Sequence, residues 1–239
     1  MDELTPPPTA LVTGASRGLG LALTRRLTAG GWRVITTARG ADLDDTAPTG
    51  STPIVGDVVD PAHRAALARA VGPRLDLLVN NASDLGPSPL PSLASVPLTA
   101  VQAVLATNVL APLGLVQAVL PALEAAGGTV VNVSSDAAVG AWPGWGPYGA
   151  SKAALDQLTA VLAVEHPDLA VYAVDPGDMR TQMHQQAFPG QDISDRPLPD
   201  AVVPGLLDLV AARPASGRYR VQAGGGWTPA AVDTAAVTA

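Results

Sequence analysis

Two kinds of apolar segment alternate along the chain. Short runs rich in β-branched residues, typical of buried strands, occupy Thr9–Thr13, Arg33–Thr37, Ile54–Val58, Leu75–Asn80, Thr129–Ser134 and Ala170–Asp175. Segments with apolar positions at helical spacing lie between several of these runs, at Leu19–Ala29, His63–Val71 and Gly149–Glu165. Strands separated by helices predict βαβ units, and therefore a parallel sheet with right-handed crossovers.

One long stretch, Leu85 to Leu123, contains no charged side chain. Its hydropathy is that of a membrane span, but it is broken by six prolines and interrupted by Asn108 and Gln117. We therefore expect no membrane partner. The pattern predicts a helix that is buried on most sides, either in the core or against another subunit.

The length of 239 residues suits one ordinary domain. We expect a disordered leader at residues 1–8, a single domain at 9–227, and a flexible tail of small residues at 228–239. The first residues are acidic and then proline-rich, without a basic region or an apolar run, so they do not resemble a secretory signal. A cytoplasmic protein is expected.

Charge and composition exclude several classes of function. The chain has 14 basic and 21 acidic residues, a net charge of −7, and shows no basic stripe of the kind that nucleic-acid binders carry. Because there is no cysteine, disulfide scaffolds and thiolate metal sites are excluded. The three histidines, His63, His166 and His184, lack ligand spacing, so no metal is expected.

A glycine-rich turn follows the first predicted strand and opens the first predicted helix. It runs from Thr13 to Gly20, with glycines at 14, 18 and 20. Glycines let the backbone turn tightly and approach a phosphate closely, and the helix N-terminus offers free N–H groups to the anion. The turn alone is weak evidence of a nucleotide site, but its strand–turn–helix context strengthens the interpretation.

From this turn onward the chain resembles the short-chain dehydrogenase/reductases. Gly14-Ala15-Ser16-Arg17-Gly18-Leu19-Gly20 after Thr13 resembles their T-G-x-x-x-G-x-G fingerprint. Further motifs follow in the family's order and spacing: Asn80-Asn81-Ala82-Ser83, with Ser in place of a family Gly; Asn108; Ser135; Tyr148-x-x-x-Lys152; and Pro176-Gly177 followed by Thr181. The resemblance covers roughly residues 9 to 227. It implies one Rossmann-type α/β domain, a doubly wound, mostly parallel sheet with helices on both faces.

The resemblance also implies an enzyme that interconverts a carbonyl and an alcohol by hydride transfer with a nicotinamide cofactor. Tyr148 and Lys152, four residues apart, share one helix face. A free tyrosine has a pKa of about 10, and a nearby ammonium is expected to lower it, so that Tyr148 can act as the acid or base. Arginine has a different donor geometry, which explains why Lys152 is the only lysine in the chain.

Two other residues complete the catalytic set that the resemblance implies. Ser135 would donate a hydrogen bond to the substrate oxygen and stabilise its developing charge. Asn108 would hold a water that links Lys152 to solvent, but a helix kink with a satisfied amide explains this asparagine as well, and both can hold.

The resemblance places the cofactor along the motifs. Its contacts are expected at Gly14, Ser16, Arg17, Gly18, Leu19, Gly20, Arg39, Asp57, Val58, Asn81, Ala82, Tyr148, Lys152, Pro176, Gly177 and Thr181. NAD-preferring members carry an acidic residue where this chain has Ala38, and Arg39 follows it. Two guanidiniums, those of Arg17 and Arg39, suit a ribose 2′-phosphate, so NADP(H) is predicted. Either arginine pointing to water would remove this argument.

The substrate side carries weaker signals. Trp142 and Trp145 lie in the loop before Tyr148, and two indoles there favour an apolar substrate surface, although core or interface positions explain them equally. Residues 182–199 resemble the family's substrate lid, with Met183 a candidate contact. The scaffold also permits reduction of a C=N bond, a dehydration or epimerisation, or NADP(H) sensing without turnover. The uncharged stretch and the Tyr148 helix resemble the family's subunit interface, which implies a homodimer or homotetramer.

Overall fold

Eight strands form one sheet in the part of the chain that the structure, a computed structural model, describes, residues 6–40 and 42–230. Their order is β3-β2-β1-β4-β5-β6-β7-β8. The first seven pair in parallel, and β8 pairs antiparallel with β7. The strands are β1 (Thr9–Thr13), β2 (Arg33–Ala38), β3 (Ser51–Val55), β4 (Leu77–Asn80), β5 (Thr129–Val133), β6 (Ala170–Asp175), β7 (Gly217–Val221) and β8 (Trp227–Pro229).

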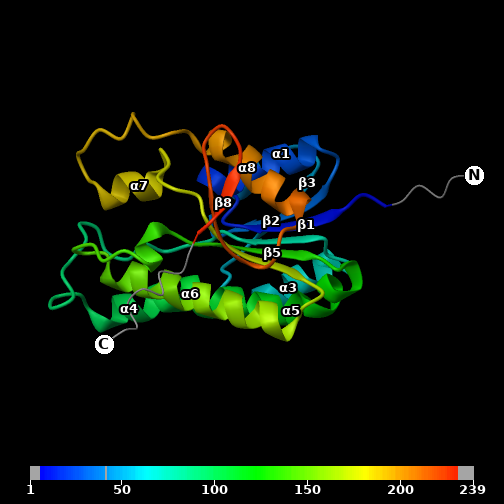
Figure 1. The fold of residues 1–239 in the computed structure, drawn as a ribbon, viewed down its shortest axis with the longest axis horizontal. Coiled ribbons are helices and arrows are strands. Elements are labelled where there is room, and N and C mark those ends of the chain that lie inside the picture. Colours follow the sequence, from blue (N-terminus) through cyan, green and yellow to red (C-terminus); the bar gives the residue numbers. More distant parts are fainter. Residues whose placement is uncertain (1–5, 41, 231–239) are drawn as a thin grey trace, which may run out of the picture.

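Helices cover both faces of this sheet (Figure 1). On one face lie α1 (Gly18–Ala29) and α8 (Pro199–Ala212), which pack against each other. On the other lie α3 (Pro61–Val71), α5 (Ala111–Ala126) and α6 (Gly146–Glu165), with α4 (Leu98–Leu105) beside α6. The short helices are α2 (Asp42–Thr46) and α7 (Gln182–Ala187). The predicted doubly wound Rossmann-type α/β domain is confirmed.

Alternation along the strands divides the core into two layers. In β1, Ala10 and Val12 belong to the cluster that packs under α1 and α8, whereas Leu11 between them belongs to the cluster under α3 and α5. All three side chains are fully buried. Because both faces of a parallel sheet are covered, its central strands are continuous apolar runs, and this is why these strands could be predicted from the sequence.

The third strand lies three residues earlier than predicted. The apolar run Ile54–Val58 was expected to form it, but β3 spans Ser51–Val55 and includes Pro53. As an edge strand, β3 has only β2 as a neighbour, so it tolerates a proline and is only partly buried. Asp57 and Val58 therefore follow the strand rather than end it.

The C-terminal part of the domain was mostly missed by the sequence analysis. Helix α8 contains Pro204 in its interior, a residue that normally argues against a helix. Gly224, Gly225 and Gly226, all at positive φ, form the turn that joins β7 to β8. The tail was predicted from residue 228, but β8 continues to Pro229, so this boundary is wrong. Residues 1–5 of the predicted leader and 231–239 of the tail lie outside the described residues.

The uncharged stretch is a loop as far as Pro97 and then a continuous helix. The helix Leu98–Ala126 comprises α4, a π-helical turn at Ala106–Leu110, and α5. By length and hydropathy it could cross a membrane, but it packs over the sheet beside α3 and α6, and half of its most apolar window is buried. Within this chain the helix is not buried on most sides, because Leu98 is 78% exposed and Leu110 is 62% exposed. Its burial against another subunit stays a prediction.

Candidate active site

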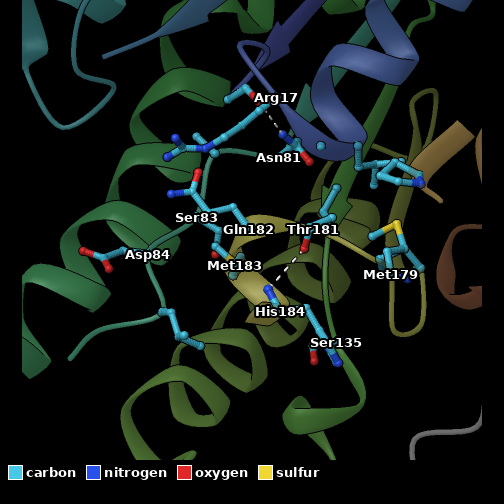
Figure 2. A pocket seen from close by; sticks show the side chains of 18 of the residues that line it. Arg17, Asn81, Ser83, Asp84, Ser135, Met179, Thr181, Gln182, Met183 and His184 are labelled. Carbon is cyan, nitrogen blue, oxygen red and sulfur yellow. Dashed lines mark hydrogen bonds between the residues drawn. The ribbon is translucent and has the colours of Figure 1, made fainter. Parts of the chain in front are cut away.

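A cavity of about 1090 Å³ lies at the carboxyl ends of the parallel strands. Residues that directly follow β1, β2, β3, β4, β5 and β6 all line it, and α7 adds one wall. Figure 2 shows Arg17 and Asn81 toward one end and Ser135 toward the other, with Met183 and His184 between them. The strand order reverses between β1 and β4, and this switch point is where doubly wound sheets bind their ligands.

The glycine-rich turn has the shape of an anion cradle. Gly14 and Gly18 take positive φ angles of 66° and 58°. Asn81 donates from Nδ2 to the carbonyls of Thr13 and Gly14 and fixes the turn. Helix α1 has no side-chain cap, so its first-turn N–H groups depend on another acceptor, and the cavity lies in front of them. This arrangement fits the pyrophosphate of a dinucleotide.

Gly20 is in the same motif but acts differently. A Cβ at this position would lie 2.4 Å from the carbonyl oxygen of Gly14. Gly20 does not line the cavity; it lets the helix pack directly against the turn. Every other residue predicted to contact the cofactor lines the cavity: Gly14, Ser16, Arg17, Gly18, Leu19, Arg39, Asp57, Val58, Asn81, Ala82, Tyr148, Lys152, Pro176, Gly177 and Thr181.

Three arginines from α1 and its N-terminal cap and from the end of β2 line the cavity. Arg17 and Arg39 line it together, as predicted, and Arg25 joins them from the second turn of α1. The sequence analysis missed Arg25, which lies outside the glycine-rich motif and belongs to the helix that follows it.

Tyr148 and Lys152 lie one turn apart on α6, and both side chains are buried, at 8% and 2% exposed. The ammonium nitrogen of Lys152 donates a 2.8 Å hydrogen bond to the carbonyl of Val133, at the end of β5. It lies 5.4 Å from the centre of the Tyr148 ring. Both side chains line the cavity, so the predicted pair is assembled.

The acidity of this pair differs from the sequence-based prediction. Burial raises the pKa of Tyr148 to about 12, and the nearby charges of Asp136 and Asp175 add to the rise, while hydrogen bonding from Ser83 and Ser135 opposes it. Burial also lowers the pKa of Lys152 to about 8, against the opposing effect of Asp156. The expected lowering of the Tyr148 pKa by Lys152 is therefore not seen, since desolvation dominates both residues. At neutral pH the tyrosine carries its proton.

Ser135 lies just after β5, lines the cavity and interacts with the Tyr148 side chain. Its hydroxyl hydrogen-bonds the Asp136 carboxylate at 3.0 Å and accepts from the Ala137 N–H, which starts a turn of 3-10 helix. Ser83 approaches Tyr148 as well, and its hydroxyl donates to Asn108 Oδ1 at 3.2 Å. Ser83, where the family motif has Gly, adds a second hydroxyl beside the tyrosine.

Asn108 lies in the π-helical turn and is completely buried. Its Nδ2 donates to the Asp84 carbonyl and to Ser151 Oγ, and its Oδ1 accepts from Ser83 Oγ and Asp84 N–H. These four bonds use every donor and acceptor position of the amide. The kink with a satisfied amide is therefore what the structure shows. The amide has no remaining position for the predicted water, and Asn108 does not line the cavity.

An apolar recess of the cavity is formed by side chains that pack with Tyr148. Trp145 packs edge-on against Tyr148 with ring centres 5.6 Å apart, and Phe188 lies 6.1 Å from Trp145. Met183 and Ala187 of α7 belong to the same cluster. Trp145 and Met183 thus line the cavity as predicted, whereas Trp142 is 56% exposed and lies outside it. The prediction for Trp142 is wrong because the loop turns between the two indoles.

A phosphate cradle at the switch point of a parallel sheet, beside a buried Tyr–Lys pair, defines a dinucleotide-dependent α/β protein. Comparison with known proteins supports this assignment. The sequence model of the short chain dehydrogenase family matches residues 8–192. This chain belongs to that family, a family of oxidoreductases that transfer hydride.

Several relatives are similar over most of the chain. Short chain dehydrogenase asqE of Emericella nidulans is 40% identical over 66% of this chain, a match that spans 64% of that protein. The 2-(R)-hydroxypropyl-CoM dehydrogenase of Xanthobacter autotrophicus is 35% identical over 79% of this chain and 81% of its own length. A short chain dehydrogenase structure from Shigella flexneri, complexed with NADP, superposes with a TM-score of 0.84 at 29% identity, covering 92% of this chain and 98% of its own.

Proposed function

We propose that this protein is an NADP(H)-dependent oxidoreductase that interconverts a carbonyl and an alcohol on a small, apolar organic substrate. One observation carries the proposal. The side chain of Tyr148 lines the cavity between a cradle suited to a dinucleotide and a recess formed by apolar side chains. A proton donor in this position can act on a substrate held against a cofactor.

The chain's own residues supply orientation, a proton and electrostatic stabilisation, and the nicotinamide supplies or accepts the hydride when it is bound. In reduction, the Tyr148 O–H donates its proton to the substrate oxygen as negative charge develops there. A raised pKa suits this direction, because the group is fully protonated at neutral pH. Ser135 donates a second hydrogen bond to the same oxygen, which requires its hydroxyl to turn away from Asp136.

Lys152 would contribute a positive charge beneath Tyr148 and donors for the cofactor ribose. Its hydrogen bond to Val133 uses one of its three N–H donors, so two remain. In the oxidative direction this charge stabilises the tyrosinate that accepts the alcohol proton. A pKa of about 8 keeps most of the ammonium charged at neutral pH.

The choice of NADP(H) over NAD(H) rests on the arginines. Arg17, Arg25 and Arg39 line the same cavity, and Ala38 stands where an acidic residue would favour an unphosphorylated ribose. Guanidinium groups bind phosphate through paired, charge-assisted hydrogen bonds. The similar Shigella flexneri structure is a complex with NADP, which supports the same choice.

The segment 182–199 is proposed as a substrate lid. Thr181 caps α7 by accepting from the His184 N–H at 3.2 Å, and Ser88 Oγ donates to the Gln186 carbonyl at 2.6 Å. The second bond ties α7 to the loop that follows β4. The other polar contacts of the segment join it to residues next to it in the chain: Asp178 lies near His184 and Arg196, and the Arg180 N–H donates to the Pro197 carbonyl. Contacts of this kind permit the segment to move as a unit.

A homodimer or homotetramer is proposed from the apolar surface of the helical layer. Leu98, Leu110 and Leu113 on the long helix, with Val161 and Val164 on α6, are exposed. Exposed apolar groups on neighbouring helices are typical of a protein–protein contact. A second copy of this chain is the partner we propose.

The test of the proposed function is consumption of NADPH, followed by its absorbance, with a panel of ketones, aldehydes, quinones and cyclic imines. Turnover of carbonyl compounds by the wild type, and not by Tyr148→Phe, would support the proposal. Turnover of imines alone, or a product formed without net change in NADPH, would replace the proposed reaction. Tight NADPH binding without any turnover would favour a sensing role.

A further inference from the structure

A chain of buried charged side chains lies behind the catalytic pair. Asp156, one turn after Lys152 on α6, pairs with Arg218 on β7, and Arg218 lies 3.9 Å from Asp175 at the end of β6. Lys152 and Asp156 are neighbours on the helix without a direct ion pair. The side chains of Asp156, Arg218 and Asp175 are 14%, 7% and 5% exposed. Burying charges is costly, so groups in this setting are held by specific partners.

Arg218 lies at the centre of this group of charged side chains. Its Nε donates to Asp156 Oδ2 at 2.9 Å, and its terminal NH2 group donates to the carbonyl oxygen of Ser135 at 2.9 Å. The same group lies 3.9 Å from Asp175 Oδ2. One planar guanidinium therefore joins the backbone of a catalytic residue to two carboxylates, a task that its fixed donor geometry suits.

Asp156 pairs with Arg218 and is also the helix neighbour of Lys152. Residues four apart on a helix are neighbours, and the two side chains interact electrostatically. Burial lowers the pKa of Lys152, and the negative charge of Asp156 acts against this lowering. Burial raises the pKa of Asp156 itself, while hydrogen bonding from Ser134 and Arg218 and the positive charges of Arg218 and Lys152 lower it. Each charge in the chain therefore helps its neighbour to stay ionised.

The remaining titratable groups near Lys152 act mainly on other residues. Tyr148, on the same helix, is neutral at the pH values concerned, because its pKa is raised to about 12. Asp136, after β5, and Asp175, at the end of β6, act on Tyr148. Asp175 also accepts from the Gly177 N–H and lies 3.9 Å from Arg220. Asp156 is thus the carboxylate that bears on the charge of Lys152.

We propose that Asp156, held by Arg218, is a positioning residue that keeps the ammonium of Lys152 charged at neutral pH, while Arg218 fixes the backbone of Ser135. The consequence for turnover rests on the proposed function. The effect on Lys152 does not, because it is a property of the folded chain without cofactor or substrate.

The amino-acid sequence allows a direct test of the effect on Lys152. Because Lys152 is its only lysine, protein labelled with ¹³C at lysine Cε gives a single lysine resonance that needs no assignment. Its chemical shift, followed from pH 5 to pH 11, reports the ionisation of this one group. We expect a midpoint near the pKa of about 8 in the wild type. In Asp156→Asn we expect the midpoint to fall by about one unit, since an adjacent opposite charge has been removed.

Two variants serve as controls. Asp156→Glu restores the carboxylate and should bring the midpoint back toward the wild-type value. Glu165→Gln removes the same charge from the exposed end of the same helix and should leave it unchanged. If Asp156→Asn is folded by circular dichroism and titrates as the wild type does, the proposal is overturned.

Arg218 is tested by the same resonance. In Arg218→Gln the buried Asp156 loses its partner and takes up a proton more readily, so the midpoint of Lys152 should fall as in Asp156→Asn. This variant leaves a buried carboxylate unpaired and can fail to fold. The double variant Asp156→Asn/Arg218→Gln removes both charges and supplies the folded comparison. Its shift should equal that of Asp156→Asn alone, and additive shifts would overturn the coupling through Asp156.

Kinetics provide the functional readout once a substrate is known. Asp156→Asn should lower kcat/KM for NADPH more at pH 8 than at pH 6, because it loses the lysine charge at a lower pH. An equal loss at both pH values would overturn the assigned role. If no compound is turned over at all, the proposed function fails, and the lysine titration still decides the role of Asp156.

Discussion

The ammonium nitrogen of Lys152 lies 5.4 Å from the ring centre of Tyr148, one turn further along α6. Both groups are buried, so each favours its neutral form. The raised pKa of Tyr148 keeps its proton in place, and the lowered pKa of Lys152 means that the lysine loses its proton at an unusually low pH. The pair is therefore prepared to donate a proton at neutral pH.

The lysine predicts a pH dependence of stability. Its pKa is 10.5 in the unfolded chain and about 8 in the folded one, so the unfolded chain binds more protons between these values. The free energy of unfolding should therefore rise as the pH increases from 8 toward 10.5, by at most about 3 kcal/mol. Above pH 10 the raised pKa of Tyr148 acts in the opposite direction.

Urea denaturation at pH 7 to 10, on the wild type and on Lys152→Met, measures this effect. The variant should be more stable than the wild type at pH 7, and the difference should shrink as the pH rises. A difference that is independent of pH would contradict the buried, easily deprotonated lysine.

The arginines predict a selective loss of cofactor affinity. Arg17→Ala and Arg39→Ala should each weaken NADPH binding by about tenfold or more, because a hydrogen bond to a charged group contributes roughly 1.5–3 kcal/mol. NADH binding should hardly change. Titration calorimetry with both cofactors gives the comparison, and Arg69→Ala, an exposed arginine on α3, is the control. Equal losses for the two cofactors would show that the guanidiniums do not recognise the additional phosphate.

The two tryptophans before Tyr148 predict opposite outcomes. Trp145→Leu removes an edge-on contact with Tyr148 and enlarges the recess, so it should raise KM for aromatic substrates by about tenfold. Trp142→Leu changes an indole outside the cavity and should leave KM within twofold. Steady-state kinetics on both variants decides the matter, and the reverse ranking would place the substrate elsewhere.

The exposed leucines predict a change of assembly. Leu110→Glu puts a charge on the surface of the long helix, where Leu110 is 62% exposed. If this surface joins two copies, the variant should sediment as a smaller species than the wild type while keeping its helix content. Val55→Glu, at the exposed edge strand β3, is the matched substitution and should not alter the sedimentation. A wild type that is already monomeric would refute the proposed oligomer.

The sequence alone predicted the fold where burial is simple. Strands β1, β4, β5 and β6 are covered on both faces and are nearly continuous apolar runs. The edge strand β3 was misplaced because an edge needs fewer apolar side chains, and α8 was missed because Pro204 lies inside it. Both elements depend on tertiary packing, which the local pattern of apolar residues does not reveal.

The site was predictable where a motif keeps its residues close in sequence. Tyr148 and Lys152 needed only a helix to meet, and the glycine turn needed only its two flanking elements. Arg218 and Asp156 are 62 positions apart and meet through the packing of β7 against α6. The raised pKa of Tyr148 depends on its burial by several elements, and the spacing of residues in the sequence could not predict that burial.

The central claim is that Tyr148 donates the proton while hydride reaches a carbonyl carbon. We would measure transfer of deuterium from C4-deuterated NADPH to the product, with the wild type and with Tyr148→Phe. The account predicts deuterium on the carbinol carbon. It also predicts a loss of kcat on the order of 10²–10⁴-fold in the variant, with the affinity for NADPH retained. Deuterium absent from the carbinol carbon, or a variant as fast as the wild type, would contradict it.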